Sequence, residues 1–260
     1  MSPPLFLFLA CIFWSVFVGD PVARAEGGNQ ELVLVREEGL ETQARQIEQM
    51  YPEVRSNLEN ALGWKLRRSP QVMLTADRVM FEKMSGSPLV SAIAVPRNQT
   101  IVMLLSATTS LSVMHETLEH ELCHLVLHDH INRKRLPKWL DEGICQWVSG
   151  SLGEILAGQG LVTAGINLSR HPIPLEQLAE RFPGEKRLLI QAYEESRLFV
   201  DFLVARYGKD GLLKVLEHLK EGEAIDEAVL KAYSSSLESL QTEWLQELQN
   251  RNLWLLWFSQ

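Results

Sequence analysis

The hydrophobic pattern of the front half predicts helices mixed with short strands. Apolar residues at spacings of three and four predict a helix over 36–62, which Pro52 should kink or divide. Asp77 stands where its side chain can cap a short helix at 78–84. Short runs rich in residues of high β propensity predict strands. The segment 96–99, which separates the last two runs, predicts a hairpin turn. These strands are expected within 26–35 and at 70–76, 91–95 and 100–105.

The back half of the chain shows helical spacing almost throughout. Its exception is the stretch 150–185, where glycines and prolines gather and loops are expected. No internal repeat occurs at the periods typical of solenoids. The chain is therefore expected to be an α+β protein, with a small β-sheet in its N-terminal half and a helical C-terminal half. The back-half helices are predicted at 112–129, 138–149, 187–206, 209–221, 224–233 and 236–249.

The first 25 residues are typical of a secretory signal peptide. An apolar run of 14 residues, Leu5 to Val18, is followed by helix breakers and an A-x-A site that ends at Ala25. The run is shorter than the roughly 20 apolar residues that span a membrane. No Lys or Arg precedes it, so an uncleaved membrane anchor or lipid attachment at Cys11 is the alternative. Export to the periplasm or the medium is expected.

Composition and charge narrow the class of protein further. Hydrophobic residues make up 46% of the 260 residues and charged residues 22%, as in ordinary globular proteins. Lys and Arg number 25 against 33 Asp and Glu, a net charge of −8, which argues against nucleic-acid binding. The expected organisation is a signal peptide (1–25) and one domain (26–260), made of an α+β part (26–110), two helices (111–150) and a loop-rich, then helical part (151–260).

The predicted helix 112–129 carries a metal-binding pattern, H-E-L-C-H, at positions 120–124. Histidines at i and i+4 lie about 40° apart around a helix, so the imidazoles of His120 and His124 can reach one ion. Glu121 stands beside that ion without having to bind it. Its carboxylate can therefore take a proton from metal-bound water.

A third ligand is predicted 18 positions after His124, in the segment 136–143. Pro137 suits the first turn of a second helix, which would present Glu142 to the same ion. Two histidines and one carboxylate, with the fourth position left to water, make a catalytic zinc arrangement. One Zn²⁺ per chain is therefore expected, which would lower the pKa of its bound water towards about 7 and polarise a scissile carbonyl.

With H-E-L-C-H followed by W-L-x-E-G at this spacing, the sequence resembles the gluzincin metallopeptidases. Within them it is similar to the peptidase MA-like proteins, which are related to thermolysin and aminopeptidase N. The resemblance covers roughly residues 70–250 and implies a zincin-like fold. Besides the zinc motifs, it is carried by the hairpin residues 92–95, by 192–200 and 206–208, and by 236–244.

The resemblance also implies a role for each site residue. His120, His124 and Glu142 would be the zinc ligands, and Glu121 would be the general base. Tyr193 matches the tyrosine that opens a Y-x-K-G motif in the aminopeptidase relatives, where it stabilises the oxyanion. Here the motif reads Y-E-E-S, and a Gly-Ala-Met-Glu-Asn type segment, which binds a substrate's free amino group, is absent. An endopeptidase is therefore the favoured interpretation.

Three more histidines and two cysteines lie close to these motifs. His115, His128 and His130 are interpreted as surface or supporting groups, because a catalytic zinc site needs only three protein ligands. Removal of the signal peptide leaves Cys123, which points off the metal face of its helix, and Cys145, one turn after the third ligand. A disulfide joining the two helices is one hypothesis, and packing of two free thiols is the other.

The sequence thus predicts an exported zinc metallopeptidase that hydrolyses bonds of peptides or proteins, with Glu121 as base. The alternatives are a catalytically idle zinc-bearing binding module of the same fold and an envelope-interaction protein that acts through Leu253–Phe258. Those six apolar residues are expected to fold back onto the domain or to dock a partner or membrane. Membrane association is expected only there or through an uncleaved N-terminus. The predicted strand 100–105 is expected to pair with an extended substrate backbone, as sheet edges do.

Overall fold

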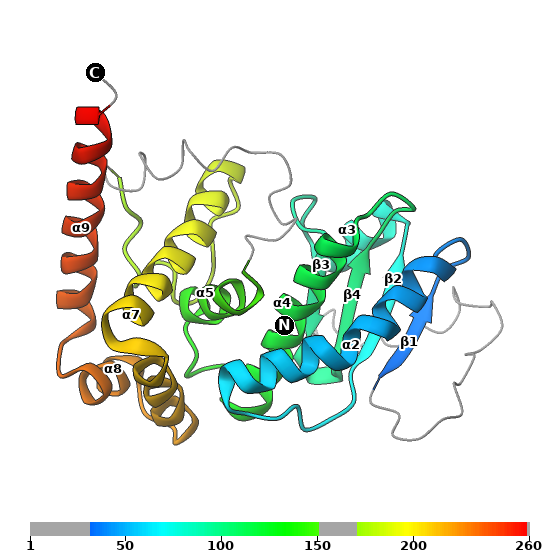
Figure 1. The fold of residues 1–260 in the computed structure, drawn as a ribbon, viewed down its shortest axis with the longest axis horizontal. Coiled ribbons are helices and arrows are strands. Elements are labelled where there is room, and N and C mark those ends of the chain that lie inside the picture. The colour runs from blue at the N-terminus through cyan, green and yellow to red at the C-terminus, as the bar shows by residue number, and fades with distance from the viewer. Residues whose placement is uncertain (1–31, 151–170, 259–260) are drawn as a thin grey trace, which may run out of the picture.

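The computed structural model describes residues 32–150 and 171–258, the last of these, from 251 on, as backbone only. The predicted signal peptide and the side chains of Leu253–Phe258 therefore lie outside the described residues. Figure 1 shows a small sheet with its helices at one end of the molecule and a group of helices at the other. Between these two groups lies helix α5 (Lys138–Ser149). The predicted α+β class is confirmed.

In the part of the chain that the structure describes, four short strands form one mixed sheet, and each lies where the sequence predicted a strand. They are β1 (Val33–Arg36), β2 (Gln71–Thr75), β3 (Ala92–Val95) and β4 (Thr100–Leu104). Their order across the sheet is β1-β2-β4-β3. β2 is parallel to both of its neighbours, whereas β3 and β4 are antiparallel and form the predicted hairpin. A single 3-10 turn, Pro96–Asn98, closes that hairpin.

The expectation that the strand 100–105 pairs with a substrate is wrong, because β4 is an inner strand. Its backbone bonds to β2 on one side and to β3 on the other, so it has no free edge. Within the described residues the edges of the sheet are β1 and β3. The hairpin was visible in the sequence, but the parallel pairing of β2 with β4 joins segments that are distant along the chain.

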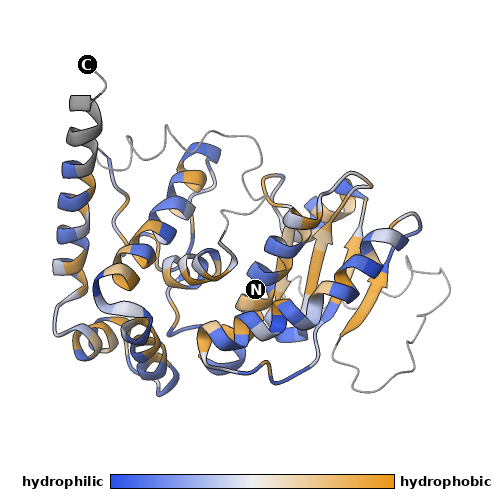
Figure 2. Ribbon diagram, in the orientation of Figure 1, coloured by the Kyte–Doolittle hydropathy of each residue, from blue (hydrophilic) through white to orange (hydrophobic). Residues whose placement is uncertain are grey.

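Helices cover both faces of the sheet. α2 (Glu41–Leu62) and α4 (Leu111–His130) pack on one face, and α3 (Arg78–Ser85) packs on the other. Alternate residues of the inner strands therefore face different layers, and Figure 2 shows these strands as apolar along their length. The predicted cap of α3 is confirmed, since the side chain of Asp77 accepts a hydrogen bond from the backbone N–H of Met80 at 3.0 Å.

Pro52 lies inside α2, which continues through it, so of the two predicted effects the division of the helix does not occur. The buried side chains of Ile47 and Val54, one on each side of the proline, belong to the same core. Loss of one backbone hydrogen bond at Pro52 is offset by this continuous packing. The helix begins at Glu41 and not at 36, because β1 ends at Arg36 and Gly39 turns the chain with a φ of +88°.

The helices of the back half lie close to their predicted positions. Gly208, with φ 73° and ψ 168°, breaks α7 between the two predicted helices that it contains. α9 is longer than predicted, because it runs on to Phe258. No helix of the described residues is long and apolar enough to cross a membrane. These elements are α7 (Lys186–Lys220), α8 (Ile225–Tyr233) and α9 (Leu237–Phe258).

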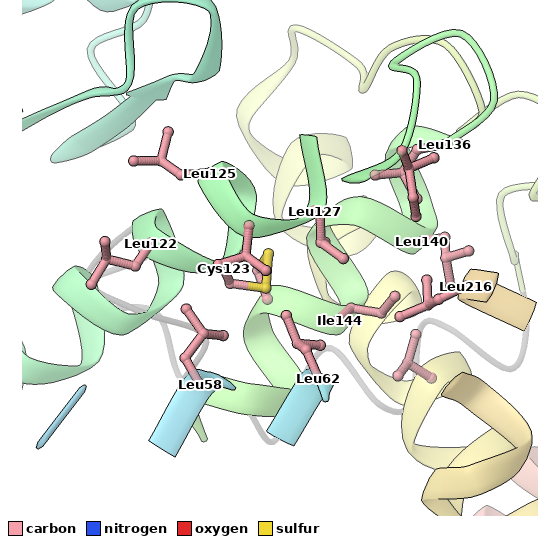
Figure 3. Packing of buried hydrophobic residues seen from close by; sticks show 14 of the residues in the cluster. Leu58, Leu62, Leu122, Cys123, Leu125, Leu127, Leu136, Leu140, Ile144 and Leu216 are labelled. Carbon is pink, nitrogen blue, oxygen red and sulfur yellow. A yellow bond between two sulfur atoms is a disulfide. The ribbon is translucent and has the colours of Figure 1, made fainter. Parts of the chain in front are cut away.

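The main hydrophobic core joins the sheet end to the helical end. Figure 3 shows Leu58 of α2 next to Leu122 of α4, Leu62 of α2 next to Ile144 of α5, and Leu216 of α7 beyond Ile144. All five side chains are at most 1% exposed. This core fixes α4 against α5, the two helices that carry the predicted metal ligands.

The crossing of α5 and α7 depends on Gly143. A Cβ at this position would meet the backbone carbonyl oxygen of Ser196 and the side chain of Val200, closer than real Cβ contacts occur. We therefore expect Gly143→Ala to lower the free energy of unfolding by about 1–3 kcal/mol, since a backbone oxygen cannot move aside cheaply. Chemical denaturation measures this change. Gly184→Ala is the control, because nothing lies within 4 Å of its added Cβ, and equal stability of the two variants would contradict the prediction.

Candidate metal centre

His120 and His124 lie one turn apart on α4 and point to the same place. Their Nε2 atoms are 3.2 Å apart, and the two residues are only 3% and 8% exposed. α4 begins cleanly because the side chain of Ser110 accepts a hydrogen bond from the N–H of Val113. Both histidines lie in the part of this helix whose side chains are buried, from Thr117 to Leu127.

Glu142 approaches the same point from α5. Its Oε2 lies 3.4 Å from Nε2 of His120 and 3.5 Å from Nε2 of His124, and the residue is 5% exposed. Backbone hydrogen bonds from Lys138 to Ala179 (2.7 Å) and from Trp139 to Leu178 (3.1 Å) anchor the first turn of α5. Pro137 is the N-cap residue, with an extended ψ of 144°, so it lies just before the first turn and not in it as the sequence suggested.

The three facing atoms suit a zinc ion. Ligand atoms that bind Zn²⁺ tetrahedrally at about 2.0–2.1 Å lie roughly 3.3–3.4 Å apart, close to the three separations between these nitrogen and oxygen atoms. Oε2 of Glu142 is buried and has no hydrogen-bond partner among the described residues. A carboxylate oxygen buried without a partner is costly unless something else binds it. The donor set of two imidazoles and one carboxylate is that of catalytic zinc sites.

Asp141 is a site residue that the sequence analysis missed. Its Oδ1 lies 2.8 Å from Nδ1 of His124, and its Oδ2 lies 2.9 Å from Nε2 of His128. Burial would raise the pKa of Asp141, but the two histidines outweigh it and hold that pKa well below its ordinary value. Such a carboxylate orients a ligating histidine from the far side of its ring. The sequence signal was its position directly before Glu142, together with His128 one turn after His124.

Lys138 is a second residue that the sequence analysis missed. Its Nζ lies 2.7 Å from Oε1 of Glu142, one turn further along α5. Burial alone would raise the pKa of Glu142, but Lys138 and His124 hold it well below the ordinary value. The available signal was a Lys and a Glu at i and i+4.

Glu121 lies on the same helix between the two histidines and is 4% exposed. Burial raises the pKa of its carboxyl above the ordinary value, and His120 and His124 partly oppose that rise. A raised carboxyl pKa suits a group that must accept a proton and then give it up near neutral pH. Its role as general base is the prediction that the sequence made.

Tyr193 comes from α7 and is 7% exposed. Its ring packs edge-on against Phe182, with the ring centres 4.9 Å apart. The pKa of its hydroxyl lies well above the ordinary value. Burial is the largest cause, and the negative charges of Glu142 and Glu121 add to it. The Tyr193 hydroxyl is therefore near enough to the carboxylates of the site to be affected by their charge. Its role in binding an oxyanion stays a prediction.

The remaining histidines near the motif have partners of their own. His115 Nδ1 lies 4.0 Å from Glu119, and the ring of His130 stacks on Trp64 with centres 4.8 Å apart. Neither belongs to a group of ligand atoms that converge on one point within the described residues. His128 does belong to such a group, together with His124 and Asp141. Its contact within that group is the one to the Asp141 carboxylate described above.

A disulfide joins α4 to α5. It links Cys123 to Cys145, whose Cα atoms are 5.3 Å apart, so the hypothesis of a bridge is the one that the structure bears out. Both cysteines are fully buried in the main core, and Figure 3 shows the sulfur bond there. The sulfur of Cys145 also lies 3.5 Å from Nδ1 of His124. The two helices that supply the converging atoms are thus cross-linked beside them.

Comparison with protein families places this chain in a known group. The sequence profile of the peptidase MA superfamily matches residues 74–250, which is most of the chain, so the protein belongs to that superfamily. The resemblance inferred from the two zinc motifs is therefore confirmed at the level of the family. No curated protein sequence matches the chain. Membership indicates a metallopeptidase-like fold, typically metal-dependent, and the converging His and Glu atoms fit that dependence.

The contact of Asp141 with two histidines gives a testable prediction. We expect Asp141→Asn to lower zinc affinity by about 10- to 100-fold, because the amide cannot fix the His124 ring as a carboxylate does. Competition with a chelator measures the affinity. His128→Gln removes only the outer histidine and should cost less. Equal zinc affinity for Asp141→Asn and the wild type would show that the carboxylate does not orient the ligand.

Proposed function

We propose that the protein is an exported zinc-dependent metallopeptidase of the gluzincin type, which hydrolyses peptide bonds in peptides or proteins. The observation that carries this proposal is the convergence of His120, His124 and Glu142 within 3.5 Å of one another, with Glu121 beside them. Zinc, when bound, supplies a Lewis acid and lowers the pKa of coordinated water. Membership of the peptidase MA superfamily supports the same reaction class.

In this proposal Glu121 moves the proton. Its carboxylate accepts a proton from the attacking water and passes it to the leaving amine. Its burial excludes bulk water from that transfer. Tyr193 comes from α7, and in this proposal its hydroxyl donates a hydrogen bond to the oxygen of the scissile carbonyl as negative charge develops there. The absence of a Gly-Ala-Met-Glu-Asn type segment, which binds a substrate's free amino group, favours an endopeptidase.

β3 is the strand we propose for substrate binding, in place of β4. Its outer edge is free within the described residues, and β3 contacts α4, which carries the histidines. An extended peptide can add to such an edge through main-chain hydrogen bonds.

We further propose that residues 26–260 form one exported domain, released by cleavage after Ala25. This rests on the N-terminal sequence, with a membrane-anchored form as the alternative. A disulfide between Cys123 and Cys145 agrees with an oxidising compartment.

The decisive experiment is metal analysis of the purified mature protein, followed by hydrolysis of fluorescently labelled casein. About one zinc per chain together with hydrolysis that a chelator abolishes is the expected result. Zinc without turnover on casein or a mixed peptide library would favour the catalytically idle binding module. Absence of zinc after incubation with the metal would overturn the proposal.

A further inference from the structure

The two carboxylate oxygens of Glu142 have different surroundings. Oε1 accepts a hydrogen bond from Nζ of Lys138 at 2.7 Å. Oε2 faces the histidine nitrogens at 3.4 and 3.5 Å and has no hydrogen-bond partner among the described residues. One oxygen is thus occupied by the protein, and the other is directed at the proposed zinc position.

Three features of the structure fix the position of Lys138. Its backbone N–H bonds to Ala179, its ammonium lies 5.1 Å above the centre of the Phe182 ring, and it precedes Glu142 by one helical turn. Its side chain is 34% exposed, whereas that of Glu142 is 6% exposed. The pair therefore bridges the solvent edge of the site and its buried interior.

We propose that Lys138 is a positioning residue, which binds Oε1 of Glu142 so that only Oε2 is offered to the metal. This deepens the proposed function and rests on it. The last torsion of a glutamate side chain is broad, so a carboxylate without such a partner can rotate and offer both oxygens. Groups that bind a ligating side chain from outside typically contribute 10- to 100-fold to metal affinity.

The direction of the effect separates positioning from simple charge repulsion. Removing a cation that only repelled the metal would tighten zinc binding. Removing a cation that orients the ligand weakens it. We expect Lys138→Met, which keeps an unbranched apolar side chain and removes the ammonium, to lower zinc affinity by about 10-fold or more in chelator competition. Lys138→Arg keeps the charge and the hydrogen bond and should recover most of that loss.

Arg55→Met is the matched control, because Arg55 forms the same i,i+4 pair with Glu59, at 2.8 Å, on α2 and not on a ligand helix. Its zinc affinity should equal that of the wild type. Unchanged or tighter zinc binding by Lys138→Met overturns the proposal, while zinc binding and hydrolysis by the wild type would still support the proposed function.

A second measurement decides the matter even if Lys138→Met fails to fold. A crystal structure of the zinc-loaded wild type should show Oε2 on the metal and Oε1 on Lys138. Zinc held by both oxygens of Glu142 in that structure would overturn the proposal and leave the proposed function intact.

Discussion

Glu121→Gln is expected to reduce kcat for peptide hydrolysis by about 100- to 10,000-fold, the range that general acid–base groups contribute. The glutamine keeps the size and most of the packing of a side chain that is 4% exposed. Its amide cannot accept the proton that the carboxylate takes. Zinc content should stay at the wild-type level, since Glu121 is not among the converging ligand atoms. Steady-state kinetics with parallel metal analysis measure both quantities.

Glu119→Gln is the matched control for this experiment. Glu119 lies on the same helix, is similarly buried at 6% exposed, and has a carboxyl pKa that burial likewise raises. Its carboxylate lies 4.0 Å from His115 and is not among the converging ligand atoms of the described residues. Its kcat should match that of the wild type. A Glu121→Gln enzyme with wild-type kcat would remove Glu121 as general base, and an equal loss in both variants would indicate damage to α4.

The sequence predicted most of this fold because its signals are local. Helical periodicity located α4 and α5 to within one residue at each end, and a proline-containing turn located the β3–β4 hairpin. The order of the strands was missed because the β2–β4 pairing depends on contacts distant in sequence. The break at Gly208 was visible as the boundary between two helices, since glycine adopts a positive φ at little cost.

The residues of the candidate site likewise divide into those that local sequence patterns predicted and those that depend on distant contacts. His120, Glu121 and His124 share one helix, so their spacing alone placed them together. Glu142 was predicted from its own motif and from Pro137. Asp141 was not found, because its two contacts depend on how α5 crosses α4. That crossing is set by the disulfide between the helices, which the sequence raised only as one of two hypotheses, and by the packed core, which joins side chains from distant segments.

Loss of Glu142 is the second large effect. We expect Glu142→Ala to weaken zinc binding by more than about 100-fold, beyond the range for residues that only orient a ligand, because a donor atom is removed. Lys138 loses its partner in this variant, but its side chain is 34% exposed and can turn towards solvent. The fold itself should therefore survive the change.

Thermal unfolding with and without zinc tests this independently of activity. A metal that binds only the folded state at a thousand times its Kd adds about 4 kcal/mol to the free energy of unfolding. The wild type should show a stabilisation of that order. At the same zinc concentration Glu142→Ala should gain about 1.4 kcal/mol or less, because a 100-fold weaker affinity leaves the metal at ten times its Kd or below. Glu142→Asp, which keeps a carboxylate on a shorter stem, should lie between them. A full zinc-dependent shift in Glu142→Ala would mean that the metal is held elsewhere. The other converging group on these two helices consists of His124, His128 and Asp141. If adding Asp141→Asn to Glu142→Ala then abolished the zinc-dependent shift, the metal would be located at that group.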